Sequence, residues 1–164
     1  MELIFSLAII FHASAIALGV GSSTLAISNF LVAIFDGQID EGERRIMGVT
    51  YIMLRVAMVS ILLTTALIYF FDTNFFGEIG VFMWVLIAVL YVNAIMMTKH
   101  WISPKIGPGL QAATWYTLGF IVTIHMFELV KLDTVTFSLL YAVDIVTALV
   151  IVNGYMKYLQ SKKK

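Results

Sequence analysis

The sequence contains no cysteine among its 164 residues. This absence excludes disulfide bonds, thiolate metal sites and cysteine nucleophiles. Charge is also scarce, because Asp, Glu, Lys and Arg make up 12% of the chain, against about 25% in a typical soluble domain. With so few charged residues, a protein of this size cannot present a mostly polar surface to water, and 61% of its residues are hydrophobic. The composition therefore predicts an integral membrane protein.

Five apolar segments are long enough to cross a bilayer, which takes about 20 helical residues. Polar breaks separate them: a capping box at Asp40 and Glu43, a turn at 72–74, the segment 104–108 with both prolines, and a cap at Asp133 or Thr134. The first segment has no basic start, so we expect a span and not a secretory signal. We predict one all-α bundle over 1–164, with spans at about Leu3–Val32, Arg45–Phe71, Ile79–Trp101, Gly109–Val130 and Val135–Tyr158.

The basic residues predict the orientation of the bundle. With five spans, the basic residues in the loops and at the span ends fall on one side, and the other side keeps only Lys131. The positive-inside rule then places the N-terminus outside and the C-terminus in the cytoplasm, in the inner membrane of the cell. The residues on the cytoplasmic side are Arg44, Arg45, Lys99, Lys105, Lys157 and Lys162–Lys164. The three terminal lysines suit anionic lipid and are too few to predict a nucleic-acid partner.

Each of four spans carries a stripe of small or polar residues. In lipid, such residues favour helix interfaces, so we expect the stripes to face a common interior. The stripes are His12, Ala15, Gly19, Ser22 and Ala26; Tyr51, Arg55, Thr65 and Tyr69; Gln111, Thr114, His125 and Glu128; and Tyr141, Asp144, Tyr155 and Tyr158. We also expect Trp101 and Trp115 to be interfacial aromatic residues near the cytoplasmic boundary.

Arg55 and Asp144 fall deep inside the predicted spans, away from the span ends. Arg55 lies roughly 15 Å along its helix from the cytoplasmic end, and Asp144 roughly 20 Å. A lone charge at such depth costs several kcal/mol, so each residue should find a partner. The two depths differ by less than the length of an arginine side chain, and we predict that Arg55 and Asp144 pair. Such a pair could stabilise the bundle, form a solute or proton path, or leave Arg55 to anchor a cofactor carboxylate.

Two histidines lie in the predicted outer half of the membrane, on two different stripes. His12 belongs to the first span and His125 to the fourth. Two imidazoles on facing helices can hold the two axial positions of a haem, and one imidazole can hold a five-coordinate haem. The sequence thus predicts a b-type haem site at His12 and His125, with ordinary packing of both rings as the alternative.

The order of these features resembles a superfamily of small haem-associated membrane bundles, which includes membrane protoporphyrinogen oxidases and copper-resistance-D-like proteins. The similar features are Phe11-His12, the small-residue run Gly19–Ser23, the stretch Glu43–Met47 and Trp84 in the third span. The resemblance implies that His12 is a haem ligand and that haem b is the cofactor. The oxidases carry a lysine shortly after the tryptophan, and Val85–Val92 has none, so the oxidase activity is not carried over.

Three functions remain open from the sequence. The first is a haem protein for electron transfer or haem handling, with His12 and His125 as ligands and Arg55 near a propionate. The second is a small channel or carrier that uses Arg55 and Asp144, formed as a homo-oligomer because five spans enclose little space. The third is a non-catalytic partner subunit whose stripes bind other membrane helices. The sequence does not decide whether the protein is an enzyme.

Overall fold

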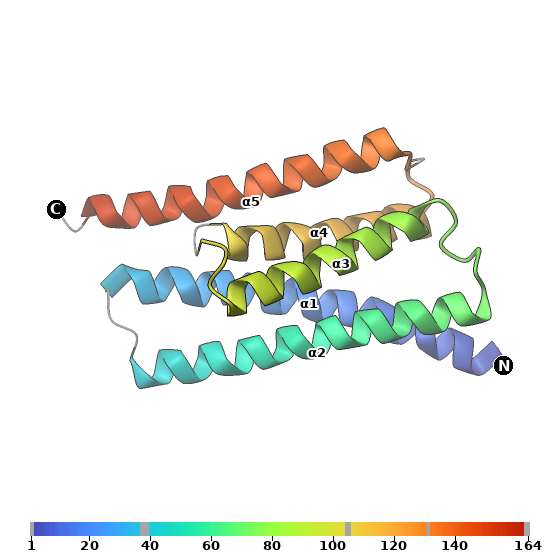
Figure 1. Ribbon diagram of the computed structural model, residues 1–164, viewed down its shortest axis with the longest axis horizontal. Coiled ribbons are helices and arrows are strands. Elements are labelled where there is room, and N and C mark those ends of the chain that lie inside the picture. Colours follow the sequence, from blue (N-terminus) through green and yellow to red (C-terminus); the bar gives the residue numbers. More distant parts are fainter. Residues whose placement is uncertain (1, 37–39, 104–105, 131, 163–164) are drawn as a thin grey trace.

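The computed structural model describes residues 2–36, 40–103, 106–130 and 132–162. Five α-helices run along one long axis and alternate in direction, so that the two chain ends lie at opposite ends of the bundle (Figure 1). They are α1 (Glu2–Asp36), α2 (Glu41–Phe71), α3 (Ile79–Thr98), α4 (Gly107–Met126) and α5 (Thr134–Lys162). We call the end that holds the N-terminus and the turn 72–78 the N-terminal end, and the other the C-terminal end.

Four of these helices are long and apolar enough to cross a membrane, over Glu2–Val32, Glu41–Phe71, Ile79–Thr98 and Thr134–Tyr158. The prediction of an all-α bundle with membrane-spanning helices is therefore supported for four of the five segments. The helix α4 is less apolar, because it carries buried polar residues such as Gln111, Thr114 and Thr117. It contacts α1, α3 and α5, so protein surrounds much of its surface. A helix in that position needs less apolar surface than one that faces lipid.

The breaks between helices follow the residues that predicted them. Asp40 and Glu43 form a capping box at the start of α2, with the Glu43 amide donating to the Asp40 carboxylate at 2.7 Å. The Asn74 amide donates to the Asp72 carboxylate at 2.9 Å and closes the turn after α2. The Thr136 amide donates to Asp133 at 2.8 Å at the start of α5. Of the residues used for the prediction, Pro104, Lys105, Lys131, Lys163 and Lys164 lie outside the described residues.

All five helices contribute apolar side chains to the interior of the bundle, and most of the large ones come from α2, α3 and α4. The largest fully buried ones are Trp115, Ile61, Ile68, Met83, Leu86, Leu90, Leu118, Ile121 and Val152. Gly19 of α1 packs directly against the indole of Trp115, because a Cβ atom built on this glycine would lie 2.3 Å from the ring. The stripe on α1 predicted to face inward is confirmed at its centre, since His12, Ala15 and Ser22 are buried.

Several details of the predicted interior are wrong. Trp115 is not interfacial, because it is fully buried (0% exposed), whereas Trp101 is 72% exposed. The helix α4 ends at Met126, and Glu128 follows in a left-handed conformation (φ 50°), exposed and off the helix. On α5, Tyr155 is exposed and does not face the interior. Hydropathy and residue type do not tell an interfacial aromatic residue from a buried one, since both positions accept it.

Candidate functional site

His12 is the buried histidine of the bundle, with 3% of its surface exposed. It lies on α1 near the N-terminal end, and its Nδ1 atom is 3.1 Å from the hydroxyl oxygen of Thr64 on α2. Its ring also packs against that of Phe76, with the centroids 5.3 Å apart. The position of His12 is thus fixed by α1, by α2 and by the turn between α2 and α3.

The hydroxyl of Thr64 indicates which nitrogen of His12 carries the proton. This hydroxyl donates its only hydrogen to the backbone carbonyl of Ser60, at 2.7 Å. With the hydroxyl bonded in this way, the tautomer of His12 that completes the contact has the proton on Nδ1 and the lone pair on Nε2. The Nε2 atom is buried and has no hydrogen-bond partner among the described residues. Metal-binding histidines have this arrangement, in which one nitrogen donates to a neighbouring group and the other is free to bind the metal.

A groove of about 530 Å³ lies beside His12 on the outer surface of α1 and α2. Its lining includes Ala8 and Ala15, which are one helical turn from His12 on either side, and also Thr64. The remaining lining is mostly apolar, with Phe11, Leu18 and Leu67 among its residues, and it also includes Ser14 and Ser60. His12 itself is not part of this lining, and the groove reaches its ring through Thr64, the partner of Nδ1.

His125 does not share this environment. Its Nε2 atom is 3.2 Å from the backbone carbonyl of Phe75, which accepts the proton of that nitrogen. It lines a separate cavity of about 340 Å³, together with Glu78 and Glu128, and His12 is not part of that lining. Both histidines lie near the N-terminal end, where His12 packs against the ring of Phe76 and His125 bonds the carbonyl of Phe75. Among the described residues no printed contact joins the two rings, and each has its own partners.

Arg55 and Asp144 are not brought together either. Asp144 accepts a hydrogen bond from the hydroxyl of Thr117 on α4, at 2.6 Å. Arg55 is exposed on α2, and among the described residues it has no hydrogen bond or ion pair. The helices α2 and α5 lie on opposite sides of the bundle (Figure 1). The two depths matched in the sequence, but depth alone does not show which helices are neighbours.

Arg55 also lies far from His12. It precedes Thr64, the partner of His12, by nine residues, which is roughly 14 Å of helix and half a turn around its axis. Thr64 faces α1, whereas Arg55 lines a cleft with residues of α3 and α4. Arg55 is thus not positioned to bind the carboxylate of a cofactor held by His12.

A buried polar contact between α3 and α4 was not predicted. The side-chain amide of Asn93 donates to the carbonyl of Gly107 at 3.0 Å and to the side-chain oxygen of Gln111 at 2.9 Å. Asn93 was missed because it lies alone in an apolar segment. A polar residue in an otherwise apolar span is itself a signal of an inward-facing position.

The described residues contain no group of three or more His, Asp or Glu side chains that could hold a metal ion. Comparison with protein-family models, curated proteins and solved structures finds no match to this chain. The function therefore has to be inferred from the residues of the chain itself. What these residues define is an apolar helical bundle, compatible with a membrane protein, with one buried imidazole whose Nε2 atom is free.

Proposed function

We propose that this protein is a multi-pass membrane protein that binds a b-type haem through His12. The observation that carries the proposal is the buried Nε2 atom of His12, which keeps its lone pair and has no hydrogen-bond partner among the described residues. Burial of a polar atom without a partner costs roughly 1–3 kcal/mol, and a metal ligand bond would compensate this cost. The hydrogen bond between Nδ1 and Thr64 orients the ring and leaves Nε2 available for iron before haem binds.

A metal that brings its own ligands suits a site with one imidazole. A bare ion needs several protein ligands, and the described residues offer no such group. In haem the porphyrin supplies four nitrogen ligands, so one histidine is enough. His125 is not required in this proposal, because its Nε2 atom is already bonded to Phe75. With one axial position open, the site suits haem handling or the exchange of a second ligand better than bis-histidine electron transfer.

Binding of a group as large as haem requires the side chains that cover Nε2 to move. Phe76 is the best placed to do so, because it lies in the turn 72–78 and not in a helix. It is 2% exposed, and its ring packs against His12. The groove lined by Ala8 and Ala15 then offers an approach from the lipid. The chemistry supplied by haem would be redox change or ligand binding at iron.

The proposal also includes the topology. We propose that α4 is the fifth crossing, that the N-terminus lies outside and that the C-terminus lies in the cytoplasm, with the inner membrane as the location. The alternating helix directions and the shared long axis support five crossings. Positive charges near the C-terminal end, such as Arg44, Arg45 and Lys99, support the orientation.

The test is an absorption spectrum of detergent-purified protein after haem is supplied, in the oxidised and reduced states. We expect a Soret band in the wild type and in His125→Ala, and its loss in His12→Ala. A wild-type spectrum without a Soret band would overturn the proposal. A band that needs His125 as much as His12 would instead favour the bis-histidine site predicted from the sequence.

A further inference from the structure

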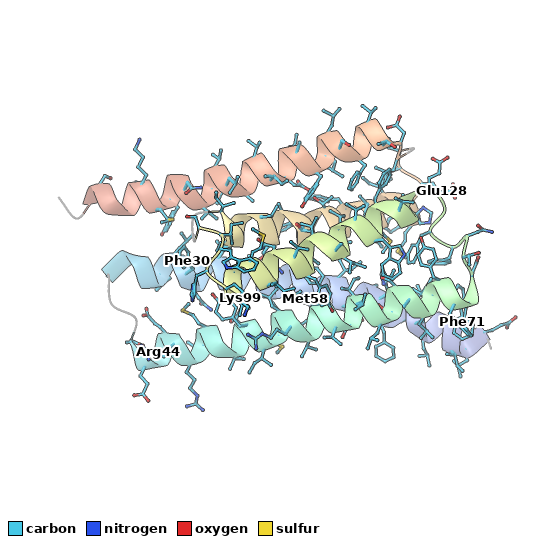
Figure 2. All side chains as sticks on the ribbon, viewed as in Figure 1. Phe30, Arg44, Met58, Phe71, Lys99 and Glu128 are labelled. Atoms are coloured by element: carbon cyan, nitrogen blue, oxygen red, sulfur yellow. The ribbon has the colours of Figure 1, made fainter. Side chains whose placement is uncertain are left out.

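The cleft beside Arg55 is a second site, separate from His12. It has a volume of about 350 Å³, within the range of small-ligand pockets. Its walls come from α2, α3 and α4 and include the apolar side chains Leu54, Met58, Ala94 and Met97. Figure 2 labels Met58 of α2 and Lys99, which follows the last residue of α3. The cleft opens on the surface, since Arg55, Tyr51 and Thr98 are exposed.

Polar groups gather on one part of this cleft. Arg55, Tyr51, Thr98 and Gln111 contribute a guanidinium, two hydroxyls and an amide to its lining. The side-chain oxygen of Gln111 accepts from Asn93, which fixes the amide group of Gln111 with its nitrogen toward the sulfur of Met58, at 3.8 Å. This sulfur is a weak acceptor, so the amide nitrogen retains a strong donor for another partner. The hydroxyl of Thr98 donates its hydrogen to the carbonyl of Ala94 at 2.8 Å, so the donors left in the lining come from Arg55, Tyr51 and Gln111.

The charge of Arg55 has no counterpart in the described structure. No carboxylate of these residues pairs with it, and the predicted partner Asp144 is bonded to Thr117. Arg55 is ten residues beyond Arg45, or roughly 15 Å deeper along α2. A cation at that depth is costly without an anion, even when the side chain extends toward the membrane surface.

We infer that the cleft binds an anionic phospholipid of the leaflet at the C-terminal end of the bundle, with Arg55 on the lipid phosphate. A guanidinium fork matches a phosphate with two parallel hydrogen bonds. The apolar walls at Leu54, Met58 and Met97 would contact the upper part of an acyl chain. In this arrangement the side chain of Arg55 extends toward the membrane surface and the lipid headgroup moves inward, so that the guanidinium reaches the phosphate. A free anion lacks the apolar part that these walls require.

The experiment is native mass spectrometry of the full-length protein in detergent, titrated with dioctanoyl phosphatidic acid. Parallel titrations use dioctanoyl phosphatidylcholine and inorganic phosphate. We expect saturable binding of phosphatidic acid, weaker binding of phosphatidylcholine and no specific binding of phosphate. Arg55→Gln should weaken the binding of phosphatidic acid at least about tenfold. Because Arg55 is exposed, this substitution leaves the packing of the core unchanged.

Two further variants distinguish binding in the cleft from a general attraction of the lipid to positive charge on the surface. Arg45→Gln removes an exposed arginine from the same helix outside the cleft, and it should change the affinity less than twofold. Ala94→Trp fills the cleft while Arg55 remains, and it should weaken binding as Arg55→Gln does. The inference would be overturned if Arg45→Gln and Arg55→Gln weakened binding equally. It would also be overturned if Arg55→Gln or Ala94→Trp left binding unchanged, or if inorganic phosphate bound as tightly as the lipid. Haem is not needed in any of these titrations, so their failure leaves the proposal for His12 untouched.

Discussion

The Nδ1 atom of His12 and the hydroxyl oxygen of Thr64 are 3.1 Å apart, and this contact joins α1 to α2. With Thr64 donating to the carbonyl of Ser60, the contact favours the tautomer of His12 that has its proton on Nδ1. The Nε2 atom is thus presented as a lone-pair donor in the apolar interior. A packing residue would not need this second nitrogen to be free, whereas an iron ligand would.

Substitution of Thr64 by valine should weaken haem binding while the bundle stays folded. Valine has the shape of threonine but no acceptor for His12, so the imidazole loses the hydrogen bond that orients it. Loss of such a supporting bond typically costs about 10–100-fold in metal affinity. A haem titration measures the effect. Thr123→Val is the matched control, because Thr123 is exposed and bonds only the carbonyl of Gly119. An affinity in Thr64→Val equal to that of the control would contradict the proposed role.

Gly19→Ala should destabilise the bundle, and Gly21→Ala should not. A Cβ atom at Gly19 meets the buried ring of Trp115, whereas a Cβ atom at Gly21 has no heavy atom within 4 Å. Overpacking of a well-packed interior costs about 1–3 kcal/mol. Unfolding in mixed detergent micelles, followed by circular dichroism, measures the two free energies of unfolding. Equal stability of the two variants would show that α1 does not pack on Trp115 in this way.

Arg55→Gln and Asp144→Asn should have independent effects on stability. The two residues lie on opposite sides of the bundle, and Asp144 bonds Thr117 and not Arg55. Effects of distant sites add within about 0.5 kcal/mol. A double-mutant cycle on the free energy of unfolding measures the coupling. A coupling well above this value would restore the ion pair predicted from the sequence, either within one chain or between two copies.

Single cysteines should report the crossing of α4. The chain has no cysteine of its own, so an impermeant maleimide reacts only at the introduced position. We expect labelling of Asp72→Cys and Asp133→Cys from the outside of intact cells, and labelling of Gly42→Cys and Lys99→Cys only after the membrane is opened. Lys99 and Asp133 flank α4. If both label from the same side, α4 does not cross the membrane.

The sequence predicted the helices well, because their boundaries depend on local residues. The caps at Asp40 and Asp133 and the turn at Asp72 are all present. The inward stripe of α1 was also predicted, since small residues such as Ala15 and Gly19 suit close helix contact.

The relations between helices could not be predicted in the same way. The expected proximity of Arg55 to Asp144 required α2 and α5 to be neighbours, and in the structure α1 and α4 lie between them. The different partners of His12 and His125 depend on the turn after α2, since His12 packs on Phe76 and His125 bonds the carbonyl of Phe75. The partner of His12, Thr64, is 52 residues away in the chain, and no local pattern marks it.

The most direct measurement is the haem spectrum of His12→Gly with and without added imidazole, next to wild type and His125→Gly. Removal of the ring leaves room for free imidazole to take its place as the axial ligand. We predict a Soret band in wild type and His125→Gly, none in His12→Gly alone, and its return when imidazole is added. A band in His12→Gly without imidazole, or no band in the wild type, would contradict a haem site at His12.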